Sequence, residues 1–393
     1  MTSYAIHAGA LFDGRNLSGP ATVHVMGDRI VGVDRTGAMP ADGTEVLDMG
    51  PSACLLPGLI DTHVHLVFDA SPDPVSSLAS TPDSALLAHM RAAARSALLA
   101  GVTTVRDLGD RDYLSLALKA ELARQPEHGP EILAAGPPLT TPGGHCHFLG
   151  GEVEGADALR AAVRERHARG CSVIKIMASG GHMTPDSVPA HASQYGLDDL
   201  RVVVDEAHRL GLPVAAHAHG LRAIEDAAEA GVDSLEHVSF LAADGVTCEP
   251  ELVDMLVRKG TFVSLTMGLD PNVAVQVPES MAAHVDALLD TYSHLHKAGA
   301  QVVVGSDAGV APWKPHDVLP HGVADLARLG VSPLAALASM TSLAARLCRV
   351  EGRKGVIAAE ADADILVVDG DVAHDPEAVL NVQAVFRAGT RVR

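Results

Sequence analysis

From about residue 80 onward, helix-like stretches alternate with short apolar runs. Each helical stretch ends in a glycine and an apolar run follows within a few residues, as in RAAARSALLAG before VTTVRDL and AAVRERHARG before SVIKIMA. Glycine suits the left-handed position that ends a helix, and continuous apolar runs are typical of strands buried on both faces. The pattern therefore predicts repeated helix–strand units. The glycines that end six of them are Gly101, Gly170, Gly211, Gly231, Gly260 and Gly299.

Two further apolar segments, CLLPGLIDTHVHL and PEILAAGPP, bring the expected number of core strands to eight. Because helices alternate with these strands, the sheet should be parallel with right-handed crossovers. Eight such units close most naturally into an α/β fold of the TIM type, a (β/α)8 barrel. A doubly wound open sheet is the alternative, but no GxGxxG follows the first strand to support it.

The two ends of the chain have a different pattern of apolar and polar residues from the middle. Short alternating segments with turn signals, such as TVHVMGDRIVGVD and GVIAAEADADILVVDGD, occur near both termini and are typical of antiparallel strands. We therefore expect a small β-sandwich domain formed by residues 1–56 and 350–393. The barrel, residues 57–349, would be inserted in it.

Composition narrows the classes of partner. The chain of 393 residues has 29 basic and 49 acidic side chains and a formal charge of −20. With no run rich in lysine or arginine, this charge argues against nucleic acid and against an anionic membrane surface as partners. No apolar run has the length of a membrane-spanning helix, and the N-terminal residues lack the features of a secretory signal. Five widely spaced cysteines without a CxxC are typical of free thiols, so we expect a cytoplasmic protein.

Polar residues end several of the predicted strands. In a barrel of this type the chemistry lies at the carboxyl ends of the strands, so these side chains should converge on one rim. They are His63 and His65 after the first strand, Lys175 in the fourth, His217 and His219 in the fifth, Glu236 and His237 in the sixth, and Asp307 in the eighth.

His63 and His65 lie two positions apart on a strand, so their side chains share a face and both can point at one ion. Imidazole nitrogen suits zinc and similar borderline metals. Lys175 stands between two isoleucines in a strand predicted to be buried, where a charged amine is costly unless paired. Burial favours the neutral amine, which can react with carbon dioxide to give a carbamate able to bridge two cations. A lysine held by a salt bridge is the alternative interpretation.

Other polar residues extend the predicted site. Asp307 can ligate a metal and accept a proton from a bound water. His145 lies in the glycine-rich segment TPGGHCHFLGG and is predicted to face the substrate. The loop after the fourth strand, residues 182–196, is expected to shape the substrate site through His182, His191 or Tyr195.

Taken together, these motifs resemble those of the amidohydrolase superfamily over almost the whole chain. PGLIDTHVHL is similar to its first metal motif, KIMASGG to its carboxylated-lysine strand, and VAAHAHG, SLEHV and VVGSDAG to its later ligand strands. Within the superfamily, GVTTVRDLG, GGHCHFLGGE and VVVDEAHRLGLPVAAHAHG resemble the imidazolonepropionase-like proteins, a branch that includes metal-dependent Xaa-Pro dipeptidases.

The resemblance implies a binuclear metal hydrolase, with zinc as the expected metal, acting on a small molecule. A hydroxide between the two metals would attack an amide, peptide-like or cyclic-amide carbon, with Asp307 as general base and acid. His145 would contact the substrate. The resemblance also implies a homo-oligomer. The implied ligands are His63, His65 and Asp307 for the more buried metal, His217 and His237 for the more exposed one, and Lys175, as a carbamate, between them.

Two departures from the family pattern bear on the substrate. Dipeptidases of this branch carry a substrate-contacting tyrosine where this chain has His219, which weakens a specific dipeptidase assignment and makes His219 a predicted substrate contact. The mononuclear deaminases lack the strand-four lysine and use a glutamate in an HxxE pattern, where this chain has Gly220. A mononuclear deaminase and a non-catalytic relative remain the alternatives to the binuclear hydrolase.

Overall fold

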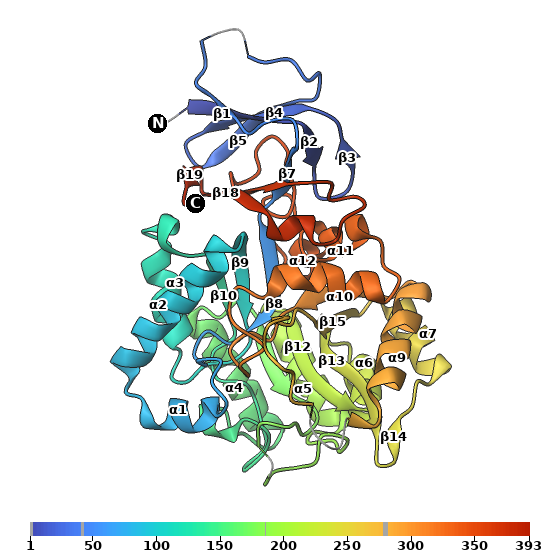
Figure 1. Cartoon of the computed structure of the whole chain (residues 1–393). Coiled ribbons are helices and arrows are strands. Elements are labelled where there is room, and N and C mark those ends of the chain that lie inside the picture. Colours follow the sequence, from blue (N-terminus) through green and yellow to red (C-terminus); the bar gives the residue numbers. More distant parts are fainter. Residues whose placement is uncertain (1–2, 41–42, 185, 278–281) are drawn as a thin grey trace.

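The computed structural model describes residues 3–40, 43–184, 186–277 and 282–393. Its centre consists of parallel strands alternating with helices (Figure 1). These strands are short and largely buried, as their continuous apolar runs predict. In chain order they are β8 (Leu59–Val64), β9 (Val102–Asp107), β10 (Glu131–Ala134), β11 (Ile174–Met177), β12 (Val214–Gly220), β13 (Ser234–Ala242), β15 (Phe262–Thr266) and β16 (Gln301–Gly305).

The eight strands form two hydrogen-bonded sheets, ordered β10-β9-β8 and β11-β12-β13-β15-β16. Isolated bridges join the two sheets at both seams. At one seam the backbone of Leu139, beyond β10, pairs with Ile176 of β11, and at the other Val64 of β8 pairs with Ala308, beyond β16. The predicted α/β barrel fold is confirmed, with its hydrogen-bonded ladder interrupted at these two seams.

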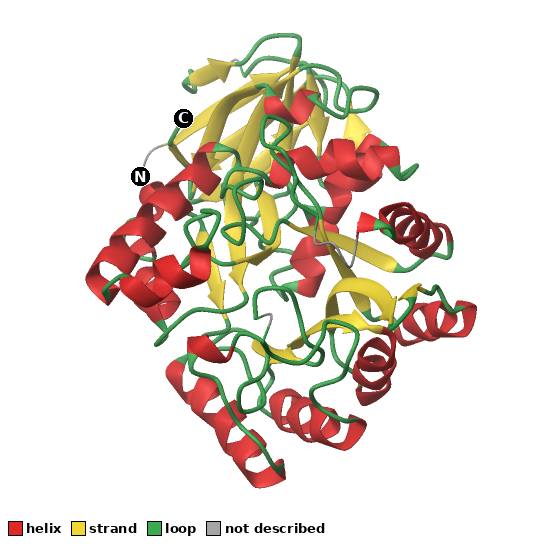
Figure 2. Cartoon of the chain, turned by 60° about the horizontal axis from the view of Figure 1, so that its bottom comes forward, coloured by secondary structure: helices red, strands yellow, loops and turns green. Residues whose placement is uncertain are grey.

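Helices surround the strands as an outer layer, and loops cross the end that faces the viewer in Figure 2. All six glycines predicted to end helices have positive φ. A two-residue strand, β14 (Gly245–Val246), pairs antiparallel with the end of β13. The helices are α1 (Pro74–Ser80), α2 (Asp83–Leu99), α3 (Leu114–Leu122), α4 (Ala156–Arg169), α5 (Leu197–Arg209), α6 (Leu221–Ala230), α7 (Pro250–Lys259), α9 (Val285–Lys297), α10 (Gly322–Arg328), α11 (Pro333–Ser339) and α12 (Ser342–Leu347).

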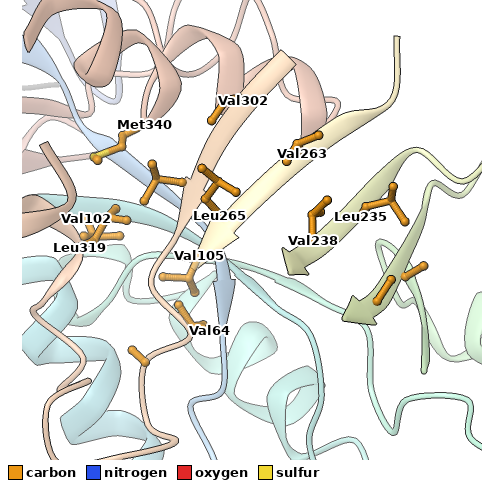
Figure 3. Packing of buried hydrophobic residues seen from close by; sticks show 14 of the residues in the cluster. Val64, Val102, Val105, Leu235, Val238, Val263, Leu265, Val302, Leu319 and Met340 are labelled. Carbon is orange, nitrogen blue, oxygen red and sulfur yellow. The ribbon is translucent and has the colours of Figure 1, made fainter. Parts of the chain in front are cut away.

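The main hydrophobic core lies between the strands and these helices. Valine and leucine side chains from several strands belong to this core, among them Val105 of β9 and Leu265 of β15 (Figure 3). Met340, beyond the end of α11, is fully buried against the same cluster. This packing holds the strands rigidly, so that side chains at their ends have fixed positions.

Two further sheets lie together at the top of Figure 1, one built from N-terminal strands alone and the other from strands of both ends of the chain. A second core, which includes Ile6, Val25, Leu55, Ile365 and Phe386, joins residues from the two ends of the chain. The boundaries of a separate β domain stay a prediction. One sheet has the order β5 (Arg29–Asp34), β4 (Ala21–Met26), β1 (Ser3–Ala8) and β6 (Val46–Asp48); the other has the order β19 (Thr390–Arg391), β18 (Val382–Arg387), β17 (Ile365–Asp369), β7 (Ala53–Pro57), β2 (Ala10–Phe12) and β3 (Leu17–Ser18).

Gly58 connects β7 of the terminal sheet directly to β8 of the barrel. A Cβ atom at this position would meet the side chain of Thr103 at 2.2 Å, so only glycine fits. Within the described part of the chain, no helix combines the length and apolarity needed to cross a membrane. All five cysteines are free.

Candidate active site

The side chains predicted to hold metal line one cavity of about 490 Å3 at the carboxyl ends of the barrel strands. Lys175 lies within β11 and Asp307 follows β16 by two residues. Two positions here have strained backbones: Asp307 has φ of 57° and His237 has φ of 72°, in the left-handed region that non-glycine residues rarely adopt. Such strain persists only where the surrounding structure enforces it, and it is concentrated at functional sites.

His63, His65 and Asp307 form the first group of candidate ligands. The two Nε2 atoms of the histidines lie 3.3 Å apart, and Oδ1 of Asp307 lies 3.5 and 3.4 Å from them. His65 donates from Nδ1 to the carbonyl oxygen of Gly109 at 3.0 Å, which leaves its Nε2 with a free lone pair. Burial lowers the pKa of both imidazoles, that of His65 to about 4, so both are neutral and able to ligate.

Glu236 and Arg106 fix the orientation of His63. Oε2 of Glu236 lies 3.0 Å from Nδ1 of His63, and Oε1 accepts a bond of 2.8 Å from Nη2 of Arg106. Burial opposes ionisation of Glu236, but Arg106 and His63 together hold the pKa of its carboxyl below the usual range. A carboxylate bonded to one imidazole nitrogen directs the other nitrogen toward a metal.

The sequence pattern assigns no role to Arg106, and it identifies Glu236 only as a polar residue at a strand end. Two charged residues in strands predicted to be buried, VTTVRDL and SLEHV, were the available signal. Both are almost completely buried in the structure.

His217, His219 and His237 form the second group, with one nitrogen of each within 4.8 Å of the others. The ring centroids of His217 and His237 are 4.6 Å apart, as are those of His219 and His237. His217 donates from Nε2 to the carbonyl oxygen of Gly180 at 3.0 Å, so its Nδ1 faces the group. Burial lowers the pKa of all three well below that of free imidazole. His219, predicted as a substrate contact, therefore lies with the candidate metal ligands.

Lys175 points into the same cavity without a partner. The residue is 1% exposed, and its Nζ has no hydrogen-bond partner among the residues that the structure describes. Burial lowers the pKa of this amine to about 8. The salt bridge weighed as the alternative at this position is absent from the described residues. Burying an amine without a partner is costly. The environment of Lys175 therefore fits a lysine that is chemically modified in the functional enzyme.

Of the next three predicted residues, two line the cavity and one does not. His145 lines the cavity, with its ring 4.6 Å from that of His217 and its Nδ1 2.6 Å from Oγ1 of Thr184. His182 also lines the cavity, with its ring 5.4 Å from that of His219. His191 lines a neighbouring cavity of about 420 Å3 instead.

Tyr195 is not brought into the site. Its ring is buried in the main core and its hydroxyl donates to the carbonyl oxygen of Val153 at 2.7 Å. It is not among the described residues that line the cavity. A loop tyrosine with its hydroxyl bound in this way supports the loop rather than a substrate.

Comparisons with known proteins identify the family of the chain. A family model described as the amidohydrolase family matches residues 54–392. An ochratoxinase from Aspergillus niger is 31% identical over 327 residues, covering 73% of this chain and 64% of the relative, so this chain spans 64% of that protein's length. An imidazolonepropionase from Paracidovorax citrulli is 26% identical over 347 residues, covering 81% of this chain and 77% of the relative.

Among solved structures, one of a Xaa-Pro dipeptidase with bound methionine in the active site superposes with a TM-score of 0.87. It is 26% identical to this chain and covers 99% of both. The fold and both ends of the chain are therefore shared with that protein.

Proposed function

The chain belongs to the amidohydrolase family; from this premise we propose that it is a hydrolase of carbon–nitrogen bonds, which cleaves an amide, peptide-like or cyclic-amide bond at a site for two metal ions. The observation that carries the binuclear proposal is Lys175, a buried amine without a partner in the cavity that both histidine groups line. Such a site needs a further anionic ligand, and a lysine carbamate is one.

The donor set fits two borderline divalent cations, and we propose zinc. His63, His65 and Asp307 would hold the first, and His217 and His237 the second. The amine of Lys175 would add to carbon dioxide, forming a nitrogen–carbon bond and releasing a proton, and the resulting carbamate oxygens would serve both groups. Cations bound here would polarise the scissile carbonyl and provide a nucleophile from water at neutral pH.

Asp307 is the proposed general base and acid. Burial opposes its ionisation, but His63 and His65 hold the pKa of its carboxyl below the usual value, so it is ionised at neutral pH. An ionised carboxylate can take the proton of the attacking water and return it to the leaving nitrogen. His145, neutral because burial lowers its pKa to about 3, is placed to contact the substrate.

A mononuclear deaminase is less compatible with this geometry. The glutamate of its HxxE pattern would stand at position 220, where a Cβ atom would meet the carbonyl oxygen of His191 at 2.3 Å. Gly220 therefore has no room for that side chain, and Lys175 would have no role.

The remaining expectations are proposed with the same function. They are a small-molecule substrate, a homo-oligomeric enzyme and a cytoplasmic location. The free state of all five cysteines supports a reducing compartment.

Elemental analysis of protein purified without chelator, with bicarbonate present, tests the proposal together with hydrolysis assays on simple amides. We expect close to two metal ions per chain, and a carbamate carbon signal in the NMR spectrum of the folded protein loaded with carbon-13 bicarbonate. Lys175→Ala should retain fewer ions and lose hydrolysis. One ion per chain in the wild type, with Lys175 unmodified, would contradict the binuclear site.

A further inference from the structure

The active-site cavity has an inner end and an outer wall of different chemistry. The candidate ligands at the inner end are nearly all buried, whereas the wall residues are mostly half-buried and apolar. A cavity of about 490 Å3 accommodates a small organic molecule that extends well beyond one scissile bond. The apolar wall is made chiefly by Phe68, Val75, Met183, Val310, Pro312 and Trp313.

Lys314 is the other lysine among the described residues of this cavity, and its amine is hydrogen-bonded to the protein backbone. Its Nζ donates to the carbonyl oxygens of Thr266 and Ser306, both at 2.8 Å, and the residue is 6% exposed. These bonds hold the ends of β15 and β16 together. The amine is therefore committed to the protein backbone and not to a ligand.

No arginine lies among the described residues that line the cavity. The two lysines there are Lys175, the proposed carbamate, and Lys314, which is bound to backbone carbonyls, so no free lysine amine is offered to a substrate carboxylate. Asp73, an exposed residue before α1, adds a negative charge among the lining residues. The formal charge of −20 on the whole chain repels anions at longer range.

We propose that the substrate is an amide whose substituents beyond the scissile bond are uncharged and apolar, such as an aryl or branched-alkyl amide, because the described part of the wall offers hydrophobic contact and no free lysine or arginine side chain. Dipeptides and N-acyl amino acids carry a free carboxylate and are poor substrates. This inference rests on the proposed function and names its substrate class. Placing an unpaired carboxylate against an apolar wall costs free energy that a neutral group of the same shape does not lose.

A matched pair of ligands tests the proposal. In the benzamides of 4-isobutylaniline and of 4-aminophenylacetic acid, a branched alkyl group and a carboxylate of similar shape occupy the same place. We expect kcat/KM to be about tenfold or more higher for the isobutyl compound. Equal values, or a preference for the carboxylate, would overturn the substrate class while leaving amide hydrolysis established.

Binding gives a readout that does not depend on turnover. Trp313, the single tryptophan of the sequence, lines the wall, so its fluorescence should report occupancy. The corresponding benzenesulfonamides resist hydrolysis and can be titrated against the metal-loaded protein. Tighter binding of the isobutyl member, with no hydrolysis of either benzamide, would support the substrate class and contradict the proposed function. Equal or tighter binding of the carboxylate member would overturn the substrate class.

A charge placed on the wall provides the matched variant. Val310→Lys adds a cation beside the substrate site, whereas Val31→Lys adds the same charge at an exposed position of β5 in a terminal sheet. We expect Val310→Lys to reduce the preference for the isobutyl ligand by about tenfold and Val31→Lys to leave it unchanged. If Val310→Lys does not fold, the two wild-type measurements still decide the proposal.

Discussion

The Nδ1 atom of His63 lies 3.0 Å from Oε2 of Glu236, although β8 and β13 are not neighbours in either sheet. The contact crosses the interior of the barrel and is completed by Arg106 of β9 on the other carboxylate oxygen. One buried carboxylate thus joins three strands. It also determines which nitrogen of His63 is available to a metal.

Removing the charge of the Glu236 carboxylate should weaken metal binding, although no metal-ligating residue is changed. For Glu236→Gln we expect metal affinity to fall by about 10- to 100-fold, since groups that orient a ligating histidine have effects of this size. Competition titration against a chromogenic chelator measures it. Glu225→Gln, on the exposed surface of α6, is the control. Wild-type affinity in Glu236→Gln would mean that His63 needs no orienting partner.

Assembly of the metal-free protein should depend on pH through Lys175. Only the neutral amine adds to carbon dioxide, and burial lowers the pKa of this amine to about 8. At constant dissolved carbon dioxide, the rate of reactivation by zinc should rise as the pH passes through about 8 and then level off. An ordinary lysine would give a rate still rising near pH 10, close to its usual pKa of about 10.4. Lys175→Arg should not recover the second ion at any pH.

Gly220 should tolerate no side chain. A Cβ at this position would meet the carbonyl oxygen of His191 at 2.3 Å, so we expect Gly220→Ala to lower the free energy of unfolding by about 1–3 kcal/mol. It should also reduce activity, because His217 and His219 precede it on β12. Denaturant unfolding measures the first effect. Gly19→Ala, at a position with open space around it, is the control and should be nearly neutral.

The junction between the barrel and the C-terminal segment depends on Lys354. Its amine is buried and pairs with Asp364, with Asp362 at 3.0 Å and with Glu131 of β10 at 3.2 Å. Lys354→Met leaves these carboxylates without that cation and should cost about 3–5 kcal/mol in the free energy of unfolding. Lys259→Met removes an exposed pair with Glu229 and should cost less than about 1 kcal/mol. Similar losses in both variants would show that the buried network is not special.

Much of the barrel follows from the sequence because local patterns determine its elements. The predicted strands are apolar runs and six of the eight follow a helix that ends at a glycine, so neither feature requires knowledge of distant residues. Candidate ligands such as His63 and Asp307 could be identified because the fold type alone places strand ends at one rim.

What could not be predicted depends on contacts between distant segments. Nothing near Arg106 in the sequence indicates that it meets Glu236, 130 positions later. Lys314 is an ordinary loop lysine in the sequence, and only the fold brings two carbonyl oxygens to its amine. Tyr195 was predicted to contact the substrate because its real partner is distant in the sequence. The carbonyl of Val153, which accepts the hydrogen bond of its hydroxyl, comes close to Tyr195 only on folding.

The pairing of β7 with β17 imposes an order on biosynthesis. Cys54 of β7 lies opposite Val368 of β17, so β7 leaves the ribosome long before its partner has been made. Until then one edge of an apolar strand is exposed, and such edges pair readily with other chains. Most barrel strands, in contrast, emerge soon before or after a sheet neighbour, and β8 alone waits for β16 at the closing seam. A nascent chain arrested before residue 365 would therefore carry a nearly complete barrel beside an unpaired edge of β7, which residues 365–369 cover once they are made.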